Sequence, residues 1–374
     1  MSSRFLPPWQ RLQRAWLDWR QLDGLPAVSP DLPPAERSLV EKLMAECLAA
    51  RHGAVSARQH AATLGELYLT LDQTGRQHFL EILASRFSVD RDQVREVARQ
   101  LAEQTDQTLF ARQVSRLQEV VVAPRQQLLR QFNALPQGVK FLIDMRADLL
   151  GFRQASSDLQ GLDADLKQLL ATWFDVGFLQ VERISWQSPA ALLEKLMAYE
   201  AVHAISSWRD LRHRLESDRH CYAFFHPGMP EEPLIFVEVA LVKGLATSIQ
   251  SLLDETAPEV DPAKADTAIF YSISNTQAGL QGISFGPFLI KEVVDSLRAT
   301  LPNLKTFSTL SPIPGLSRWL GSVMSDPTFQ ESLLAETLVT IGEQWGVPPT
   351  LHAVLAAPQF KEASADDVET LQEP

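Results

Sequence analysis

Apolar residues recur at helical spacing through the first half of the chain. Within 36–51, Leu39, Leu43, Met44 and Cys47 fall on one face of a helix. The same spacing returns in 56–71, 76–86, 125–132 and 139–153. Turn residues at 136–138 break the chain between the last two segments. The pattern predicts an all-α bundle over about residues 1–170, preceding a second domain over 171–374.

The pattern changes after residue 170, where short segments alternate between apolar and polar positions. We predict strands over 178–184, 221–225, 234–242, 267–274 and 305–310. Helices are predicted over 188–205, from Ser207, over 248–255 and 286–301, and again beyond Arg318. Strand 234–242 is apolar on both faces except at Glu238, which is typical of a strand inside a sheet. The predicted fold class is therefore α+β, with a helical bundle followed by a mixed β-sheet that carries helices on both faces.

Charge and composition exclude several functional classes. The net charge of −12 is unsuited to a nucleic-acid-binding surface, and no run of about 18 apolar residues predicts a membrane span. Cys47 and Cys221 lie far apart and in no ligand spacing, so we expect neither a disulfide nor a metal site and predict a reducing, cytoplasmic location. Basic residues and tryptophans in 1–21 fit a transit peptide only partly, and a tail packed on the body is the favoured interpretation.

The most informative stretch lies between 268 and 286. A predicted strand enters a loop that holds Gly279, Gly282 and Gly286, and a helix follows directly. Glycines allow a ligand to approach the backbone, and a helix N-terminus offers free N–H groups with a partial positive charge. This arrangement suits a diphosphate, although a tight turn that packs helix on strand would give the same pattern, and the spacing does not match the dinucleotide fingerprint.

A second candidate is Ser311, in the segment Ser-Pro-Ile-Pro-Gly. The serine follows a predicted strand, where ligands meet open α/β sheets, and two prolines stiffen the exit. A simple turn serine would look the same, so the pattern alone leaves both interpretations open.

Several long strings resemble malonyl-CoA decarboxylases, in the same order along most of the chain and most closely from about Trp173 to Leu320. They are MRADLL at 145–150, LEKLMAYEAVH at 193–203, HPGMPEEPL at 226–234 with VAL at 239–241, the loop at 271–286 and the segment 307–320. The resemblance implies a helical, oligomer-forming domain and a catalytic domain like the GNAT acyltransferases. It also implies conversion of malonyl-CoA to acetyl-CoA and CO2 without metal or organic cofactor.

The resemblance also assigns binding and catalytic roles to individual residues. The family's acyl-CoA-binding loop corresponds to Gln281, Gly282, Ile283, Ser284, Phe285, Gly286 and Pro287, and its catalytic serine to Ser311, which we expect to contact the substrate too. Ser274, Gln277, Gly279 and His226 are weaker candidates for the same site. His226 could instead be a satisfied strand-end residue. His203 is expected to pack on a helix, and Glu238 to have a structural partner.

The resemblance breaks at two places. The family pairs its serine with a proton-donating histidine in a segment that reads Arg-Phe-His-Leu-Gly-Asn-Gly-Ala, and the 374 residues hold no such segment. Some relatives carry a glutamate where this chain has Ser284. We therefore expect a C-terminally incomplete decarboxylase whose own activity is severely reduced or absent. An acyl-CoA-dependent acyltransferase and an inactive CoA-binding protein remain as alternatives, and a homo-oligomer of a bacterial cytoplasm is expected.

Overall fold

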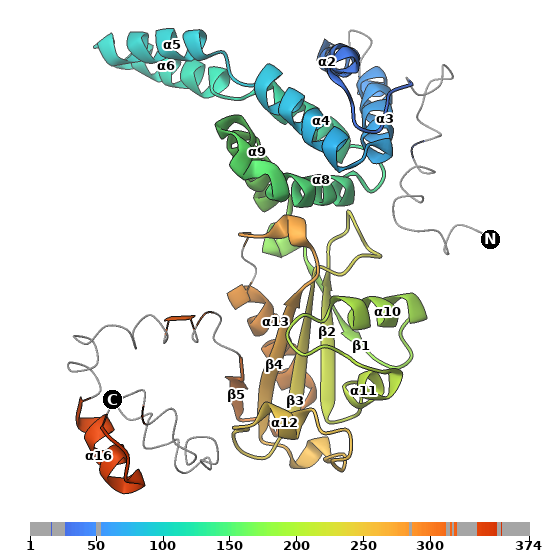
Figure 1. Ribbon diagram of the computed structural model, residues 1–374, viewed down its shortest axis with the longest axis vertical. Helices are drawn as coiled ribbons and strands as arrows, with labels where there is room; N and C mark the ends of the chain where they lie inside the picture. Colours follow the sequence, from blue (N-terminus) through green and yellow to red (C-terminus); the bar gives the residue numbers. More distant parts are fainter. Residues whose placement is uncertain are drawn as a thin grey trace. The chain divides into compact units, whose positions relative to one another are not determined.

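Helices make up the N-terminal part of the computed structural model, which describes residues 16, 27–49, 54–283, 286–311, 315, 318–319, 335–349 and 353. They are α2 (Pro34–Ala49), α3 (Ala54–Thr70), α4 (Gln73–Arg86), α5 (Arg91–Glu103), α6 (Gln107–Val120), α7 (Pro124–Asn133), α8 (Gly138–Phe152) and α9 (Ser157–Trp173). Figure 1 shows α5 and α6 side by side as a hairpin, and α6 buries none of its residues. The predicted helical region is confirmed, and the sequence pattern had not separated α6 or α9.

Capping residues explain where several of these helices begin. The Asp90 carboxylate accepts hydrogen bonds from the amides of Asp92 and Gln93 at 3.0 Å, which fixes the start of α5. Asp72 and Ser156 cap α4 and α9 in the same way. Before α8, Gln137 adopts a left-handed conformation with φ 56°, so the chain turns at the predicted break.

An aromatic cluster forms the centre of the helical core. The Trp16 and Phe141 rings meet edge to face at 5.0 Å between centroids, and Tyr68 packs on Phe79 at 5.1 Å. The Trp16 indole also donates a hydrogen bond to the Pro136 carbonyl at 2.8 Å. Trp16 is fully buried, so this part of segment 1–21 packs on the body as the favoured interpretation expected.

A five-stranded sheet with the order β1-β2-β3-β4-β5 follows the helices. Its strands are β1 (Gln180–Ile184), β2 (Arg219–Phe225), β3 (Ile235–Val242), β4 (Thr267–Asn275) and β5 (Thr306–Thr309). β1 and β2 are antiparallel and β4 and β5 are parallel, so the sheet is mixed. β3 lies at its centre, and its buried Glu238 accepts a hydrogen bond from Arg214 at 3.0 Å, which confirms the prediction of a structural partner.

Helices pack on both faces of this sheet. Alternate β2 residues, among them Cys221 and Phe225, join a core with residues of α10 (Ala190–Tyr199) and α11 (Trp208–His213). Tyr222, which points to the other face, interacts with Ser296 of α13 (Gly286–Thr300). The predicted α+β class is therefore confirmed. Two further helices are α12 (Ile249–Leu252) and α16 (Ala335–Trp345).

The predicted helix over 188–205 is too long. α10 ends at Tyr199, and the Glu200 carboxylate then accepts hydrogen bonds from the amides of Val202 and His203 at 2.9 Å. His203 therefore lies after the helix and not on it. At Ser207 the predicted cap is present, because its hydroxyl accepts from the Asp210 amide at 3.0 Å.

The chain divides into two compact units, Met1–Glu238 with Ile273–Pro302 and Val239–Ser272 with Asn303–Pro374. Their border runs through β3 and β4, and the domain boundary expected near residue 170 stays a prediction.

Both thiols are free and buried, and burial raises the pKa of Cys47 to about 12. Among the helices of the described residues, none has the length and apolar character that crossing a membrane requires.

Candidate functional site

The loop after β4 is tied to the segment that precedes β3. The Thr276 amide donates to the Leu234 carbonyl at 3.0 Å, and the Gln277 side-chain amide donates to the Pro233 carbonyl at 3.0 Å. The Thr276 hydroxyl donates to the same Pro233 oxygen. Gln277 is only 5% exposed, so these bonds form in a largely water-free place and fix the start of the loop.

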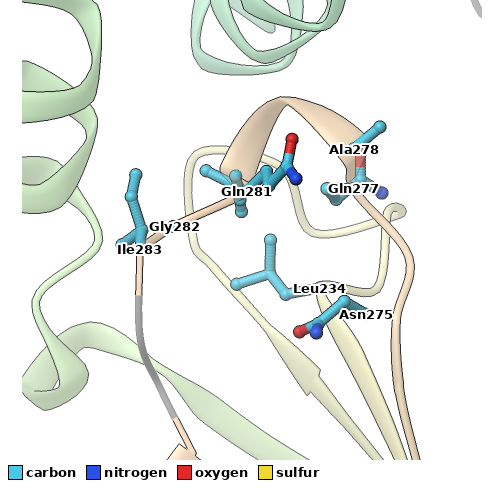
Figure 2. A pocket seen from close by; sticks show the side chains of 8 residues that line it. Leu234, Asn275, Gln277, Ala278, Gln281, Gly282 and Ile283 are labelled. Atoms are coloured by element: carbon cyan, nitrogen blue, oxygen red, sulfur yellow. The ribbon is translucent and has the colours of Figure 1, made fainter. Parts of the chain in front are cut away.

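A cavity of about 310 Å³ lies at this loop. Its lining is Leu234, Asn275, Gln277, Ala278, Leu280, Gln281, Gly282 and Ile283, whose side chains Figure 2 shows around the turn that follows β4. Four predicted binding residues, Gln277, Gln281, Gly282 and Ile283, are thus brought together at one cavity. Apolar walls and amide groups at its rim suit a ligand that is part polar and part apolar.

The backbone amides of the loop are more fully used than the sequence pattern suggested. The amides of Leu280, Gln281 and Ile283 close local turns by donating to carbonyls three residues earlier, at 3.0 to 3.1 Å. The Gly282 amide donates no hydrogen bond within the described part of the chain. A ligand anion at this loop can therefore use the Gly282 amide and the first turn of α13, which begins at Gly286, but not the amides on either side of Gly282.

The two glycines of the loop serve different purposes. A Cβ on Gly279 would stand 1.9 Å from the Ile143 carbonyl oxygen, so the missing side chain lets the short helix η4 (Ala278–Leu280) pack against α8. Gly282 has φ +78°, a conformation that side chains disfavour, and it is exposed. Gly279 thus follows the packing alternative of the sequence analysis, whereas Gly282 leaves open backbone beside the cavity.

Arg146 of α8 binds the loop through two of its carbonyls, and the sequence analysis did not single this residue out. Its side chain is 1% exposed, and Nη1 donates to the carbonyls of Gly279 at 2.6 Å and Gln281 at 3.0 Å. Nε donates to Asp163 of α9 at 2.8 Å, which balances the buried charge. The guanidinium therefore connects α8, α9 and the loop. Its only sequence signal is its place in the string at 145–150.

The remaining weaker candidates do not line the cavity. The Ser274 hydroxyl is 1% exposed and accepts a hydrogen bond from the Ala201 amide at 3.1 Å. The Gly228 amide donates to Nδ1 of His226 at 3.0 Å, so Nε2 carries the proton that goes to the Trp173 carbonyl at 3.1 Å. Burial lowers the pKa of His226, and the hydrogen bond to the Trp173 carbonyl partly opposes that shift, so the folded protein favours the neutral ring.

Ser311 lies in the second compact unit, two residues after the end of β5. β5 runs parallel to β4 with Thr309 opposite Phe270, and the Leu310 amide continues the ladder by donating to the Phe270 carbonyl at 2.9 Å. Leu310 packs on a core formed by Ala240, Ile269, Tyr271 and Leu252. Ser311 itself is exposed, at the point where the chain leaves the sheet. Ser311 therefore follows a strand, as the sequence analysis expected.

Two of the predicted residues, Ser284 and Phe285, lie outside the described residues, and Gly286 and Pro287 are described only as the start of α13. No group of three or more histidine, cysteine, aspartate or glutamate side chains in the described ranges is arranged to hold a metal ion.

Comparison with known proteins gives consistent matches along the chain. The family model of the malonyl-CoA decarboxylase N-terminal domain matches residues 87–174, and that of the C-terminal domain matches residues 177–369. Malonyl-CoA decarboxylase, mitochondrial, from Anser anser anser is 36% identical over 73% of this chain and 56% of its own length. The Rattus norvegicus protein of the same name is 40% identical over 66% of this chain and 52% of its own length. The chain thus spans about half the length of these curated relatives.

Solved structures agree with the sequence matches. The crystal structure of malonyl-CoA decarboxylase from Rhodopseudomonas palustris superposes with a TM-score of 0.74 at 38% identity, over 90% of this chain and 78% of that one. The Agrobacterium vitis structure gives a TM-score of 0.73 at 38% identity, over 88% and 77%. The C-terminal family model alone covers more than half of the 374 residues. The chain therefore belongs to the malonyl-CoA decarboxylase family.

Proposed function

We propose that this protein binds malonyl-CoA and releases CO2 from it to leave acetyl-CoA. The observation that carries the proposal is the cavity at the loop after β4, because Gln281, Gly282 and Ile283 correspond to the family's acyl-CoA-binding loop and line it together. Gly282 offers an open amide there, and the acidic total charge is no obstacle to an anion held by local donors. The family match supports the reaction, and the cavity supports the substrate class.

The chemistry sets clear demands on the protein. Loss of CO2 breaks the bond between the malonyl carboxyl group and the adjacent carbon, and its electron pair moves into the thioester as an enolate. A donor placed where that charge develops on oxygen lowers the barrier, and an acid then delivers a proton to carbon. We propose Ser311 as a donor to the carboxylate or the enolate oxygen. The reaction needs no metal or organic cofactor, so dialysis against a chelator should leave turnover unchanged.

Three further expectations belong to this proposal. The mixed sheet with parallel β4 and β5 is compatible with a GNAT-like catalytic domain. Exposed apolar residues on the α5–α6 hairpin, such as Leu109 and Phe110, favour a homo-oligomer formed through the helical region. Light scattering coupled to size exclusion measures that state. The cytoplasmic location stays a prediction.

The first experiment separates the proposed reaction from its alternatives. The protein is incubated with malonyl-CoA and no amine, and malonyl-CoA, acetyl-CoA and CO2 are measured together. Equal release of acetyl-CoA and CO2 supports the decarboxylase. Consumption only after an amine is added would indicate an acyltransferase. CoA binding by calorimetry with no CO2 after long incubation would leave a non-enzymatic CoA-binding protein.

The role of Ser311 is tested by substitution. In a version of the protein that carries the family's proton-donating segment, we expect Ser311→Ala to lower the turnover number about tenfold or more, as loss of one donor to a developing negative charge does, with CoA affinity largely kept. Ser308→Ala, which removes a half-buried hydroxyl from the same strand β5, is the matched control and should retain turnover. Near-normal turnover of Ser311→Ala would contradict the assigned role.

A further inference from the structure

A lysine from the helical region lies beside the exposed glycine of the loop. Lys167 projects from α9, and its side chain is exposed. Its Nζ lies 3.2 Å, and its Cε 3.5 Å, from the point that a Cβ on Gly282 would occupy. The ammonium group therefore stands next to the Gly282 backbone, at a residue that lines the cavity.

The charge of Lys167 is not neutralised by its own helix. Asp163 lies one turn earlier, at the spacing that favours an ion pair, but it is already bound by Arg146 at 2.8 Å and by Arg153 at 3.4 Å. Within the described ranges Lys167 forms neither an ion pair nor a hydrogen bond. An ammonium group without an acceptor in that part of the chain thus stands beside a residue whose backbone amide also has none.

These two donors match one kind of ligand. A phosphate group carries several acceptor oxygens, so it can accept from an ammonium and from a backbone amide at once. Lys acts as a strong point charge in such contacts and needs no fixed geometry, which suits an exposed side chain. In a protein of net charge −12, a local cation also offsets the general repulsion of an anion.

We propose that Lys167 binds a phosphate group of the CoA part of the substrate, together with the Gly282 amide. The inference rests on the proposed acyl-CoA function and extends it to the helical region. Residues 87–174, which the N-terminal family model matches, then contribute directly to substrate binding through α9. The phosphate is either the diphosphate or the 3′-phosphate of CoA, which share this chemistry.

Calorimetry with truncated forms of the ligand tests the proposal. The wild type, Lys167→Gln and Lys167→Arg are titrated with CoA, 3′-dephospho-CoA, pantetheine and malonyl-pantetheine. Lys42→Gln, which removes one positive charge from an exposed lysine of α2, is the matched control. We expect Lys167→Gln to weaken CoA binding about tenfold, the size of one charge-assisted contact at an exposed site. Lys167→Arg should restore most of the affinity, and added salt should reduce the difference.

Comparison of the affinities for the different ligands then shows which phosphate of CoA Lys167 contacts. Equal weakening with CoA and 3′-dephospho-CoA, and none with pantetheine, assigns Lys167 to the diphosphate. Weakening with CoA alone assigns it to the 3′-phosphate.

Two results would overturn the inference while leaving the proposed function intact. In one, the wild type binds CoA and Lys167→Gln binds it equally well, or loses no more affinity than Lys42→Gln. In the other, the substitution weakens malonyl-pantetheine, which has no phosphate, so that the contact is to the carboxylate. A wild-type protein that binds no CoA at all would instead remove the proposed function, and the inference with it.

Discussion

Two cationic side chains of the helical region lie beside the loop after β4, one buried and one exposed. We call the part of the loop around Gly279 its inner side and the part around Gly282 its outer side. On the inner side, Gly279 packs against α8 and the buried Arg146 guanidinium donates to two carbonyls and a carboxylate. On the outer side, Gly282 is exposed and Lys167 stands beside it without a partner in the described chain. The side chains of Arg146 and Lys167 therefore have different roles at the same loop.

The contrast follows from desolvation. A buried cation must be hydrogen-bonded and paired, because leaving it or its partners unmatched in a low-dielectric interior is unfavourable. Arg146 meets that demand through Asp163 and the two loop carbonyls, and its 1% exposure makes it a structural residue of the loop. A solvated lysine carries no such demand and remains available to a ligand. We infer that the inner side sets the shape of the loop and the outer side meets the substrate.

The largest expected effect comes from removing the inner cation. Arg146→Met leaves the carbonyls of Gly279 and Gln281 without this donor, and leaves the Asp163 carboxylate only the longer contact with Arg153. We expect a loss of about 3–5 kcal/mol in the free energy of unfolding, the range for breaking a buried charge pair. Urea denaturation followed by circular dichroism measures it.

Arg153→Met is the matched control, because Arg153 contacts the same Asp163 carboxylate at 3.4 Å from a side chain that is 38% exposed. It should change stability by less than about 1 kcal/mol. Equal effects of the two substitutions would show that burial of the guanidinium is not what holds the loop.

The second effect tests the close approach of η4 to α8. Gly279→Ala forces a methyl group to within 1.9 Å of the Ile143 carbonyl oxygen, so backbone must move. We expect destabilisation of about 1–3 kcal/mol, as for overpacking in a core. In contrast, Gly151→Ala in α8 meets no atom within 4 Å and should stabilise the protein by about 0.5–1 kcal/mol. Thermal melting of both variants compares them, and a harmless Gly279→Ala would remove the packing argument.

A smaller effect is expected at His226, where the ring ties the segment after β2 to the end of α9. Because burial lowers its pKa, the folded state favours the neutral ring. This contribution to stability is complete above the ordinary histidine pKa of about 6.5 and is lost as the pH falls below it. His226→Gln should therefore be less stable than the wild type at neutral pH and show a shallower loss on acidification. Urea denaturation of both proteins across that pH range tests this expectation. If their free energies of unfolding fell equally with pH, a lowered pKa of His226 in the folded state would be contradicted.

The periodic patterns predicted most elements, because each depends on residues close in sequence. Alternation and apolar runs located β2, β3 and β4. Periodicity failed at His203, because apolar spacing continues past the true end of α10, where the Glu200 side chain competes for the backbone amides. That competition is invisible in a count of apolar positions.

The candidate site was predictable only in part, for a related reason. The string around residue 281 identified the loop, but the contact of Arg146 with Gly279 joins residues 133 positions apart. No pattern among neighbouring residues of the sequence predicts such a contact. Local spacing also could not show that the amides of Leu280, Gln281 and Ile283 close turns, which leaves the Gly282 amide as the open one among these four. Tertiary packing decides both points.

The smallest expected effect on stability, at Lys167, tests the difference between the two cationic side chains most directly. Lys167→Gln removes a solvated charge without an ion-pair partner in the described chain, so we expect the free energy of unfolding of the ligand-free protein to change by less than about 0.5 kcal/mol. Saturating CoA should then stabilise the wild type more than the variant, because stabilisation by a ligand rises with its affinity. Melting curves with and without CoA report both quantities in one experiment. If Lys167→Gln destabilised the ligand-free protein as much as Arg146→Met does, Lys167 would be a structural residue, and the division of work between the two sides of the loop would fail.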